Sequence, residues 1–484
     1  MVKEVSRRDF IKYAGGGFAA IVVGSKLDWV LKTPTYAAVQ THTIALEIGD
    51  VMKQMVTHNS IHDARCYFWA YKATTPNLPA DVPGPIIFAT QGDTVNITVT
   101  NLLDEPHSLA IPGVWAGTGQ IAPNGGVFTG SFVVPATASG AYLYYDNLNE
   151  PVNRMMGLHG AFVVMPDFTQ APPGGAGNKW TPYHNPTANV QALFNAFGNP
   201  NIFPGLAWGE GDSNPATFAP PFRTYIWLDH QASPNLFAEV GNFTSGADYS
   251  ASQFIDRFLN STFDPTNSVN FKGAQYFTID GQSGHFVHNN PNITPMLRVG
   301  EPCIVHILNA GLWMHSMHLH ANHFFVTSIN GTVHDNPVWV DVFNIYPMDR
   351  VDYVLPYMRP PDVPNVRGIG FPDTPLTTVG SAPHPTWPPT EELNTFIPPV
   401  GTKAKDAQGN DVSLAVQLSP LCYPMHDHSE PTQTAQGGNY NLGLIAGMNF
   451  IGDRNTPGGV TTFPDNPNHV PPNTTRPPAE PHAH

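Results

Sequence analysis

Two stretches of the chain share one spacing of glycine, asparagine and histidine. In the first, Gly92 is followed nine residues later by Asn101, and in the second, Gly300 is followed nine residues later by Asn309. A histidine stands six residues after each asparagine. Ungapped agreement between stretches so far apart indicates a repeat of whole-domain size. The chain is therefore predicted to contain two copies of one domain.

Short alternating segments surround both copies. "GDTVNITVTN" and "GAYLYY" belong to the first, and "CIVHILN" and "HFFVTSIN" to the second. β-branched and polar residues alternate in them between Gly, Pro, Asn and Asp, which is typical of strands with one buried face. The 50 prolines and 43 glycines, with only 12% charged residues, favour the same class. We predict an all-β chain of two β-sandwich domains with long loop insertions.

These patterns divide most of the chain into four parts. Sandwich domains are expected at residues 41–168 and 221–454, joined by a linker or insertion at 169–220, and residues 455–484 are expected to form a disordered tail. A further long insertion is expected at about residues 356–409. Loops of this length are usually functional, so this insertion is expected to cover a site or to contact a neighbouring subunit.

The amino-terminal residues 1–40 have the form of an export signal. Arg7 and Arg8 precede a short, weakly apolar run from about Tyr13 to Gly24, which is too short to span a bilayer comfortably. The segment resembles a twin-arginine signal with cleavage near Ala37 or Ala38. This predicts a protein exported in the folded state to the periplasm, the cell surface or the exterior, without a stable membrane anchor. An uncleaved anchor is the alternative.

Charge and cysteine content argue against several classes of protein. The formal net charge of −15 disfavours a nucleic-acid partner, which requires clustered Lys and Arg. Cys66, Cys303 and Cys422 are too few and too widely spaced for a disulfide framework, and they match no zinc motif. Each is expected to be a buried small apolar residue, with Cys422 the one to examine further because it lies four residues before a histidine.

Histidines distinguish the second copy of the repeat from the first. The second copy has the pairs His318 and His320, and His426 and His428, each separated by one residue. Residues i and i+2 of a strand point to the same face, so two neighbouring strands can bring four imidazoles together. Nitrogen ligation at this density suits copper, with zinc as the less favoured occupant. We predict a metal site formed by these four histidines.

The first copy has other residues at the four matching positions. In the order of the histidines just named, they are Ala110, Pro112, Tyr145 and Asn147. Tyr145, Asn147 and Asp427, which lies between the second pair of histidines, are expected to line the site and support its ligands. Tyr145 is also a candidate redox partner of the metal, the alternative being that it only fills the volume of a lost histidine.

Two further histidines lie in the same stretch, "MHSMHLHANHFF". His315 has a counterpart, His107, in the first copy. Two interpretations of His315 therefore stay open: a metal ligand, or a structural residue shared by both copies. His323 follows the histidine cluster and is expected to pack.

The segment "HSMHLHANHFF" resembles the His-x-x-His-x-His signature of the multicopper oxidases, the laccases and their relatives. "GPIIFATQGDTVNITVTN" resembles the first cupredoxin domain of that family and "YFTIDGQS" its last, over about residues 47–167 and 221–454. The resemblance implies two cupredoxin-like (plastocyanin-like) Greek-key sandwiches, copper as cofactor, and a small-molecule or metal-ion substrate. A two-domain chain is similar to the two-domain oxidases and copper nitrite reductases, which implies a homotrimer as one assembly.

The copper ligands of the family are incomplete in this chain. The resemblance implies that His315 binds the type 1 copper and that the four paired histidines face a trinuclear cluster. The cysteine expected between His426 and His428 is Asp427, so the thiolate of a blue copper site is absent there. The first domain lacks its own histidine pairs, which leaves one or two coppers as the expected complement. A displaced type 1 site that includes Cys422 is the alternative.

Three functions are compatible with this pattern. The first is an exported copper oxidoreductase that oxidises a phenol or metal ion by one electron, or reduces nitrite or oxygen. The second is a non-catalytic protein that binds, stores or delivers copper, and the third is a structural module. An open coordination position on the metal favours an enzyme, whereas four histidines around one ion leave little room for a substrate.

Overall fold

The computed structural model describes fourteen ranges of the chain. They are residues 39–57, 63–167, 170–197, 222–243, 248–262, 271–288, 290, 293–299, 303–320, 322–356, 403–405, 411–413, 421–429 and 444–453. Residues 1–38 of the expected export signal, the tail expected at 455–484 and nearly all of the insertion at 356–409 lie outside them. No helix in these ranges is long and apolar enough to cross a membrane.

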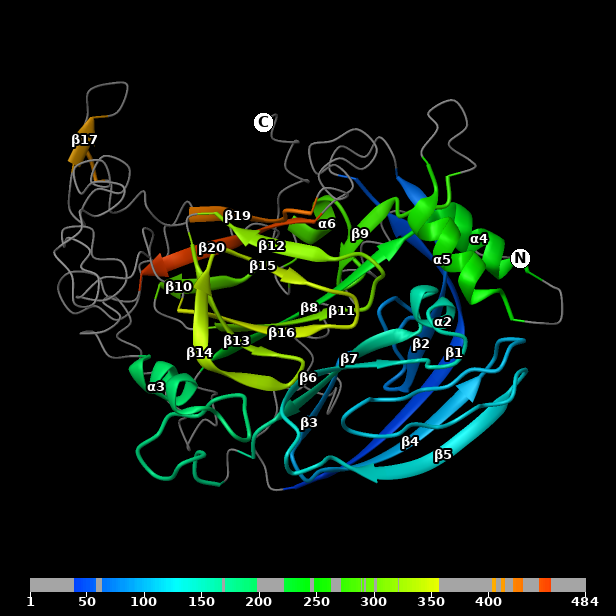
Figure 1. Ribbon diagram of the computed structural model, residues 1–484, viewed down its shortest axis with the longest axis horizontal. Helices are drawn as coiled ribbons and strands as arrows, with labels where there is room; N and C mark the ends of the chain where they lie inside the picture. The colour runs from blue at the N-terminus through cyan, green and yellow to red at the C-terminus, as the bar shows by residue number, and fades with distance from the viewer. Residues whose placement is uncertain are drawn as a thin grey trace.

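The first domain is a sandwich of two sheets, coloured blue to cyan (Figure 1). The larger sheet has the order β2-β1-β4-β5, with β1 at Thr41–Met55, β2 at Ala64–Thr75, β4 at Thr94–Asn101 and β5 at Gly126–Val133. The smaller has the order β3-β7-β6, with β3 at Ile87–Thr90, β6 at Gly140–Tyr145 and β7 at His159–Met165. Every second residue of β4 is buried, as its sequence alternation predicts.

The second domain is a larger sandwich beside the first (Figure 1). One sheet has the order β14-β13-β16-β11-β8-β9, with β8 at Arg223–Ala232, β9 at Tyr276–Ile279, β11 at Cys303–Asn309, β13 at Phe324–Ile329, β14 at Thr332–Val340 and β16 at Arg350–Leu355. The other has the order β10-β20-β19-β12-β15, with β10 at Met296–Val299, β12 at His315–Leu319, β15 at Val342–Ile345, β19 at Leu421–Asp427 and β20 at Ile445–Asp453. A separate hairpin joins β17 (Lys403–Lys405) to β18 (Asp411–Ser413).

The two domains repeat one pattern of strand pairing. In the first, β1 pairs in parallel with β4 and antiparallel with β2; in the second, β8 pairs in parallel with β11 and antiparallel with β9. The opposite sheets also match, because β3-β7-β6 and β10-β20-β19 each combine one parallel and one antiparallel pair. The predicted all-β fold is confirmed, and the sequence repeat corresponds to a repeat of topology.

The shared asparagine of the repeat has one structural role in both domains. Asn101 Nδ2 donates to the carbonyl of Glu105 at 2.7 Å, and Asn309 Nδ2 donates to the carbonyl of Trp313 at 2.8 Å. In each case the side-chain oxygen accepts from the amide two residues further on. These bonds fix the turn after the strand and so set the position of the histidine six residues after each asparagine.

Several helices interrupt the β structure. They are α2 (Val152–Met155), α3 (Ala188–Ala196), α4 (Pro234–Gly241), α5 (Ala251–Asn260) and α6 (His285–His288). Although α4 and α5 follow β8 of the second domain, they pack on the core of the first, where the ring of Phe237 lies 5.4 Å from that of Phe68. Part of the expected linker is also packed, because Tyr183 donates a 2.8 Å hydrogen bond to Asp352. These insertions attach the two sandwiches to each other.

Candidate metal centre

The two histidine pairs of the second domain lie on neighbouring strands. β12 and β19 pair antiparallel, with His318 directly opposite His426. The backbone amide of His320 donates to the carbonyl of Pro424 at 2.9 Å, and that of His428 donates to the carbonyl of Ser316 at 2.8 Å. This register places the histidines of both strands on one face of the sheet, because alternate residues of a strand share a face.

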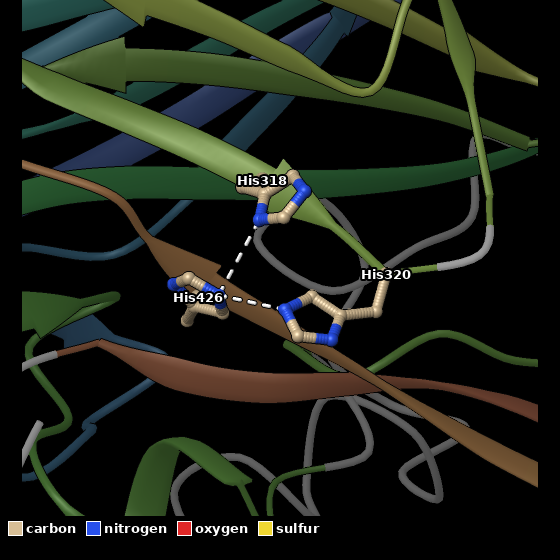
Figure 2. A group of neighbouring side chains, drawn as sticks. All are labelled: His318, His320 and His426. Carbon is tan, nitrogen blue, oxygen red and sulfur yellow. Dashed lines mark hydrogen bonds between the residues drawn. The ribbon is translucent and has the colours of Figure 1, made fainter. Parts of the chain in front are cut away.

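Three imidazoles point toward one another at this place (Figure 2). His318 Nδ1 lies 3.4 Å from His426 Nε2, and His320 Nε2 lies 2.9 Å from the same atom. All three ligand atoms lie within 4.8 Å of one another. An imidazole nitrogen binds zinc or a similar ion at about 2.0 Å, so two nitrogens on one ion stand roughly 2.8 to 4.0 Å apart. The separations of 3.4 Å and 2.9 Å from His426 Nε2 therefore fit a single ion.

The ring of His426 is already oriented for metal binding. Its Nδ1 lies 3.2 Å from the backbone carbonyl of Asp427. A carbonyl only accepts, so Nδ1 carries the proton and Nε2 presents its lone pair to the other two histidines. A hydrogen bond from the non-ligating nitrogen to a carbonyl or carboxylate is the usual arrangement of a histidine that binds a metal.

The surroundings keep the three imidazoles uncharged at neutral pH. Burial, with added repulsion from the neighbouring histidines, lowers the pKa of His318 and of His320, and it lowers the pKa of His426 to about 4. A neutral imidazole has a free lone pair, whereas a protonated one cannot bind a metal ion. The electrostatics of the cluster thus favour the state that binds a metal.

His428 lies at the edge of this group. Its ring centre is 5.3 Å from that of His318 and 5.5 Å from that of His426, and its side chain is exposed. Of the four histidines predicted to form the site, the structure brings three together, and His428 is not one of the three nitrogens that meet. It follows the last residue of β19, where the chain leaves the sheet.

Family models match both sandwiches. A model described as multicopper oxidase matches residues 63–168, and a second model of the same description matches residues 262–356. These matches assign both sandwiches to the multicopper oxidase family. Membership implies copper as the metal, and the nitrogen donors of the three histidines suit it.

Solved structures of similar proteins include several copper enzymes. The multicopper oxidase mgLAC aligns with a TM-score of 0.46 and 16% identity, over 85% of this chain and 86% of that one. The blue copper oxidase from Nitrosomonas europaea aligns with a TM-score of 0.46 and 15% identity, over 89% and 92%. A copper nitrite reductase from the same organism aligns with a TM-score of 0.41 and 14% identity, over 85% and 94%. No curated protein matches the sequence.

His315, the type 1 copper ligand expected from the multicopper oxidase pattern, lies on the opposite face of the sheet from the cluster. It is fully buried, its Nδ1 lies 2.7 Å from Asp427 Oδ2, and its Nε2 lies 2.5 Å from Gln231 Nε2. Burial lowers the pKa of His315, but Asp427 outweighs this and raises it above its usual value. Both ring nitrogens are engaged by protein groups, so the structure supports the structural interpretation of His315.

Strand alternation also determines the role of Asp427. Its side chain points to the same side as His315, where it accepts from the Ser316 amide at 2.7 Å and from the Ser429 hydroxyl at 2.8 Å. Asp427 therefore reaches the histidine cluster through its backbone carbonyl, and its carboxylate does not line that site. The position that is a cysteine in the multicopper oxidase pattern belongs to a buried hydrogen-bonded pair in this chain.

The first domain contains an equivalent pair. His107 Nδ1 lies 2.7 Å from Asp146 Oδ2, and both side chains are completely buried. The repeat spacing places His107 and Asp146 at the positions of His315 and Asp427. Each sandwich thus has a buried histidine–aspartate pair at this position of the repeat.

Tyr145 and Asn147 lie in the first domain, away from the three histidines. Tyr145 faces Ala110 across an antiparallel bridge, and the charges that act on its pKa are those of Glu150 and Arg154. Asn147 accepts a 2.8 Å hydrogen bond from the hydroxyl of Ser108. Within the described part of the chain, the clustered ligands all come from the second domain.

The cysteines and His323 complete the set of predicted positions. Cys66 and Cys303 are buried and form no disulfide. Cys422 lies on β19 with its backbone paired to Asn449, and its side chain lies outside the described residues, so the displaced type 1 site stays a prediction. The ring of His323 stacks on Trp339 with centres 5.3 Å apart.

One charged neighbour of the cluster was not expected from the sequence. Asp341 Oδ2 lies 3.4 Å from His318 Nε2. It lies between β14 and β15, far in sequence from both histidine pairs, and no motif includes it. Only the pairing of β12 with β15 brings it to the site.

Proposed function

We propose that this multicopper oxidase family member is a copper oxidoreductase with one copper ion held by His318, His320 and His426. The observation that carries the proposal is the convergence of three imidazole nitrogens from two paired strands. Three protein ligands leave a coordination position for a substrate, which is the usual difference between catalytic and purely structural metal sites. The edge position of His428 supports this, because a fourth imidazole on the ion would occupy the coordination position that a substrate needs.

The protein groups around the cluster have three tasks. β12 and β19 hold the imidazoles in register, and the Asp427 carbonyl fixes the ring of His426. His426 is buried, whereas His320 is exposed, so a small molecule reaches the cluster from the side of His320. Bound copper supplies one-electron redox chemistry at this place. The expected reaction is a one-electron transfer between copper and a phenol, a metal ion, nitrite or dioxygen.

The proposal is tested by measuring copper per chain together with the visible spectrum of protein purified from copper-supplied cells. About one copper per chain, without the intense band of a thiolate-bound copper, is expected. Oxidase and nitrite reductase assays then separate an enzyme from a copper-binding or storage protein. Three or more coppers with a strong blue colour would contradict the proposal and favour a site that includes Cys422.

Export and assembly are separate proposals. The twin-arginine pattern of residues 1–40 supports export of the folded chain, which cell fractionation of the chain with and without Arg7→Lys and Arg8→Lys tests. A homotrimer follows from the resemblance to two-domain oxidases and copper nitrite reductases. Light scattering of the purified protein measures the mass of the assembly and decides this point.

A further inference from the structure

We propose, building on the proposed copper site, that Asp341 is a positioning residue which selects Nδ1 of His318 as the copper ligand. Asp341 approaches His318 at the ring nitrogen that does not face His426. Its Oδ2 lies 3.4 Å from His318 Nε2, while His318 Nδ1 faces His426 Nε2. One ring nitrogen thus faces a carboxylate and the other faces the cluster.

The backbone holds Asp341 in this place. Leu319, the residue after His318, donates its amide to the carbonyl of Asp341 at 2.9 Å. Val342, the next residue along, pairs directly with His318 in the β12–β15 ladder. Asp341 is therefore fixed on both sides by the sheet that contains His318, although its carboxylate is partly exposed.

The chemistry of the carboxylate sets the tautomer of His318. A carboxylate accepts hydrogen bonds, so the approach of Asp341 to within 3.4 Å favours a proton on His318 Nε2 and leaves Nδ1 unprotonated. His426 Nε2 is unprotonated as well, because its Nδ1 donates to the Asp427 carbonyl. Two lone pairs then face each other 3.4 Å apart, an arrangement that a cation between them stabilises. Asp341 and the Asp427 carbonyl together prepare the cluster for a metal ion.

Asp341 acts through His318 and is not itself a ligand in this arrangement. Groups that orient metal-binding histidines in this way typically change metal affinity by 10- to 100-fold when removed. Because the Asp341 carboxylate is partly exposed, we expect the Asp341→Ala variant to bind Cu(II) about tenfold more weakly. The Asp341→Asn variant keeps an acceptor oxygen for the Nε2 proton and is expected to recover most of the affinity.

Two measurements on the full chain test this. The first is nitrogen NMR of the copper-free protein labelled at histidine, with the His318 signals assigned by their loss in His318→Gln. The Nε2-protonated tautomer is expected in the wild type and in Asp341→Asn, and a mixture of tautomers in Asp341→Ala. The second is Cu(II) affinity by chelator competition. Asp335→Ala is the matched control, because Asp335 is exposed on β14, and it is expected to leave both readouts unchanged.

The outcomes separate this inference from the proposed function. A wild-type chain that binds no copper overturns the proposed function, and the inference is then judged by the NMR of the copper-free protein alone. An Nδ1-protonated His318 in the wild type, or an Asp341→Ala variant with unchanged tautomer and affinity, overturns the inference. Complete loss of copper binding in both Asp341 variants also overturns it, because that result identifies Asp341 as a ligand.

Discussion

His318 lies directly opposite His426 across β12 and β19, with 3.4 Å between Nδ1 and Nε2. At the equivalent place in the first domain, Ala110 faces Tyr145 across a similar antiparallel bridge. One backbone arrangement therefore presents two imidazoles in one domain and an alanine and a tyrosine in the other. The ability of this chain to bind a metal depends on side chains that only the second domain has.

Replacing a clustered histidine should abolish tight copper binding. His426→Gln removes the nitrogen that lies closest to both other ligands. A weakening of more than about 100-fold is expected, since even groups that only orient a ligand contribute 10- to 100-fold. Chelator competition measures the change. His428→Gln, beside it in sequence, is the matched control and is expected to weaken copper binding less. If His428→Gln weakens copper binding more than His426→Gln does, His428 and not His426 is the ligand.

Removing His315 should destabilise the fold without removing copper. His315→Leu removes the ionic partner of the buried Asp427 carboxylate, and breaking a buried ion pair in this way typically costs about 3–5 kcal/mol of unfolding free energy. Urea unfolding of the copper-free protein measures this cost. His107→Leu, which breaks the equivalent pair with Asp146, is expected to behave in the same way. Loss of copper in His315→Leu with an intact fold would instead identify His315 as a ligand.

Acid should destabilise the protein partly through His159. Burial lowers the pKa of this histidine to about 3, with further contributions from Arg154 and Lys53. Between pH 6.5 and 3 the unfolded chain binds a proton that the folded chain does not, so stability falls as the pH falls. Between pH 7 and pH 4, the free energy of unfolding of the wild type is expected to fall by roughly 3 kcal/mol more than that of His159→Gln. Urea unfolding at both pH values tests this, and equal losses would contradict it.

Copper binding should persist below the pH at which ordinary histidines are protonated. Only neutral imidazoles bind the metal, so affinity falls as the pH drops through the pKa values of the ligands. An ordinary histidine is protonated below about pH 6.5, whereas the pKa of His426 is about 4 and those of His318 and His320 are also lowered. We therefore expect affinity to fall less between pH 7 and pH 5.5 than it would for ligands with the ordinary histidine pKa. A steep loss between these values would contradict the lowered pKa values.

Tyr145→Phe should leave the copper site unchanged in a single chain. The charges of Glu150 and Arg154 act on the pKa of Tyr145, and this tyrosine is not part of the histidine cluster. The copper EPR spectrum and affinity are therefore expected to match those of the wild type. A changed spectrum would indicate that Tyr145 of one subunit meets the histidines of another, and this result would support the predicted homotrimer.

Much of the architecture follows from local sequence patterns. The alternation in β4 and the shared spacing from Gly92 to His107 and from Gly300 to His315 predict two matching sandwiches, and the structure has both. The sharing of one face by His318 and His320, and by His426 and His428, is also readable from sequence, because alternate residues of a strand share a face whatever the strand's neighbours are. The packed helices α4 and α5 were not predicted, since they are insertions that match neither copy of the repeat.

The composition of the site was decided by tertiary structure. By itself the sequence determined which residues could share a face, because that depends only on backbone periodicity within a strand. It could not determine that His428 lies at the edge, that His315 pairs with Asp427 and Gln231, or that Asp341 meets His318. These outcomes depend on strand register and on a third strand, β15, which brings in a residue distant along the chain. Contacts between strands arise only when the sheet assembles.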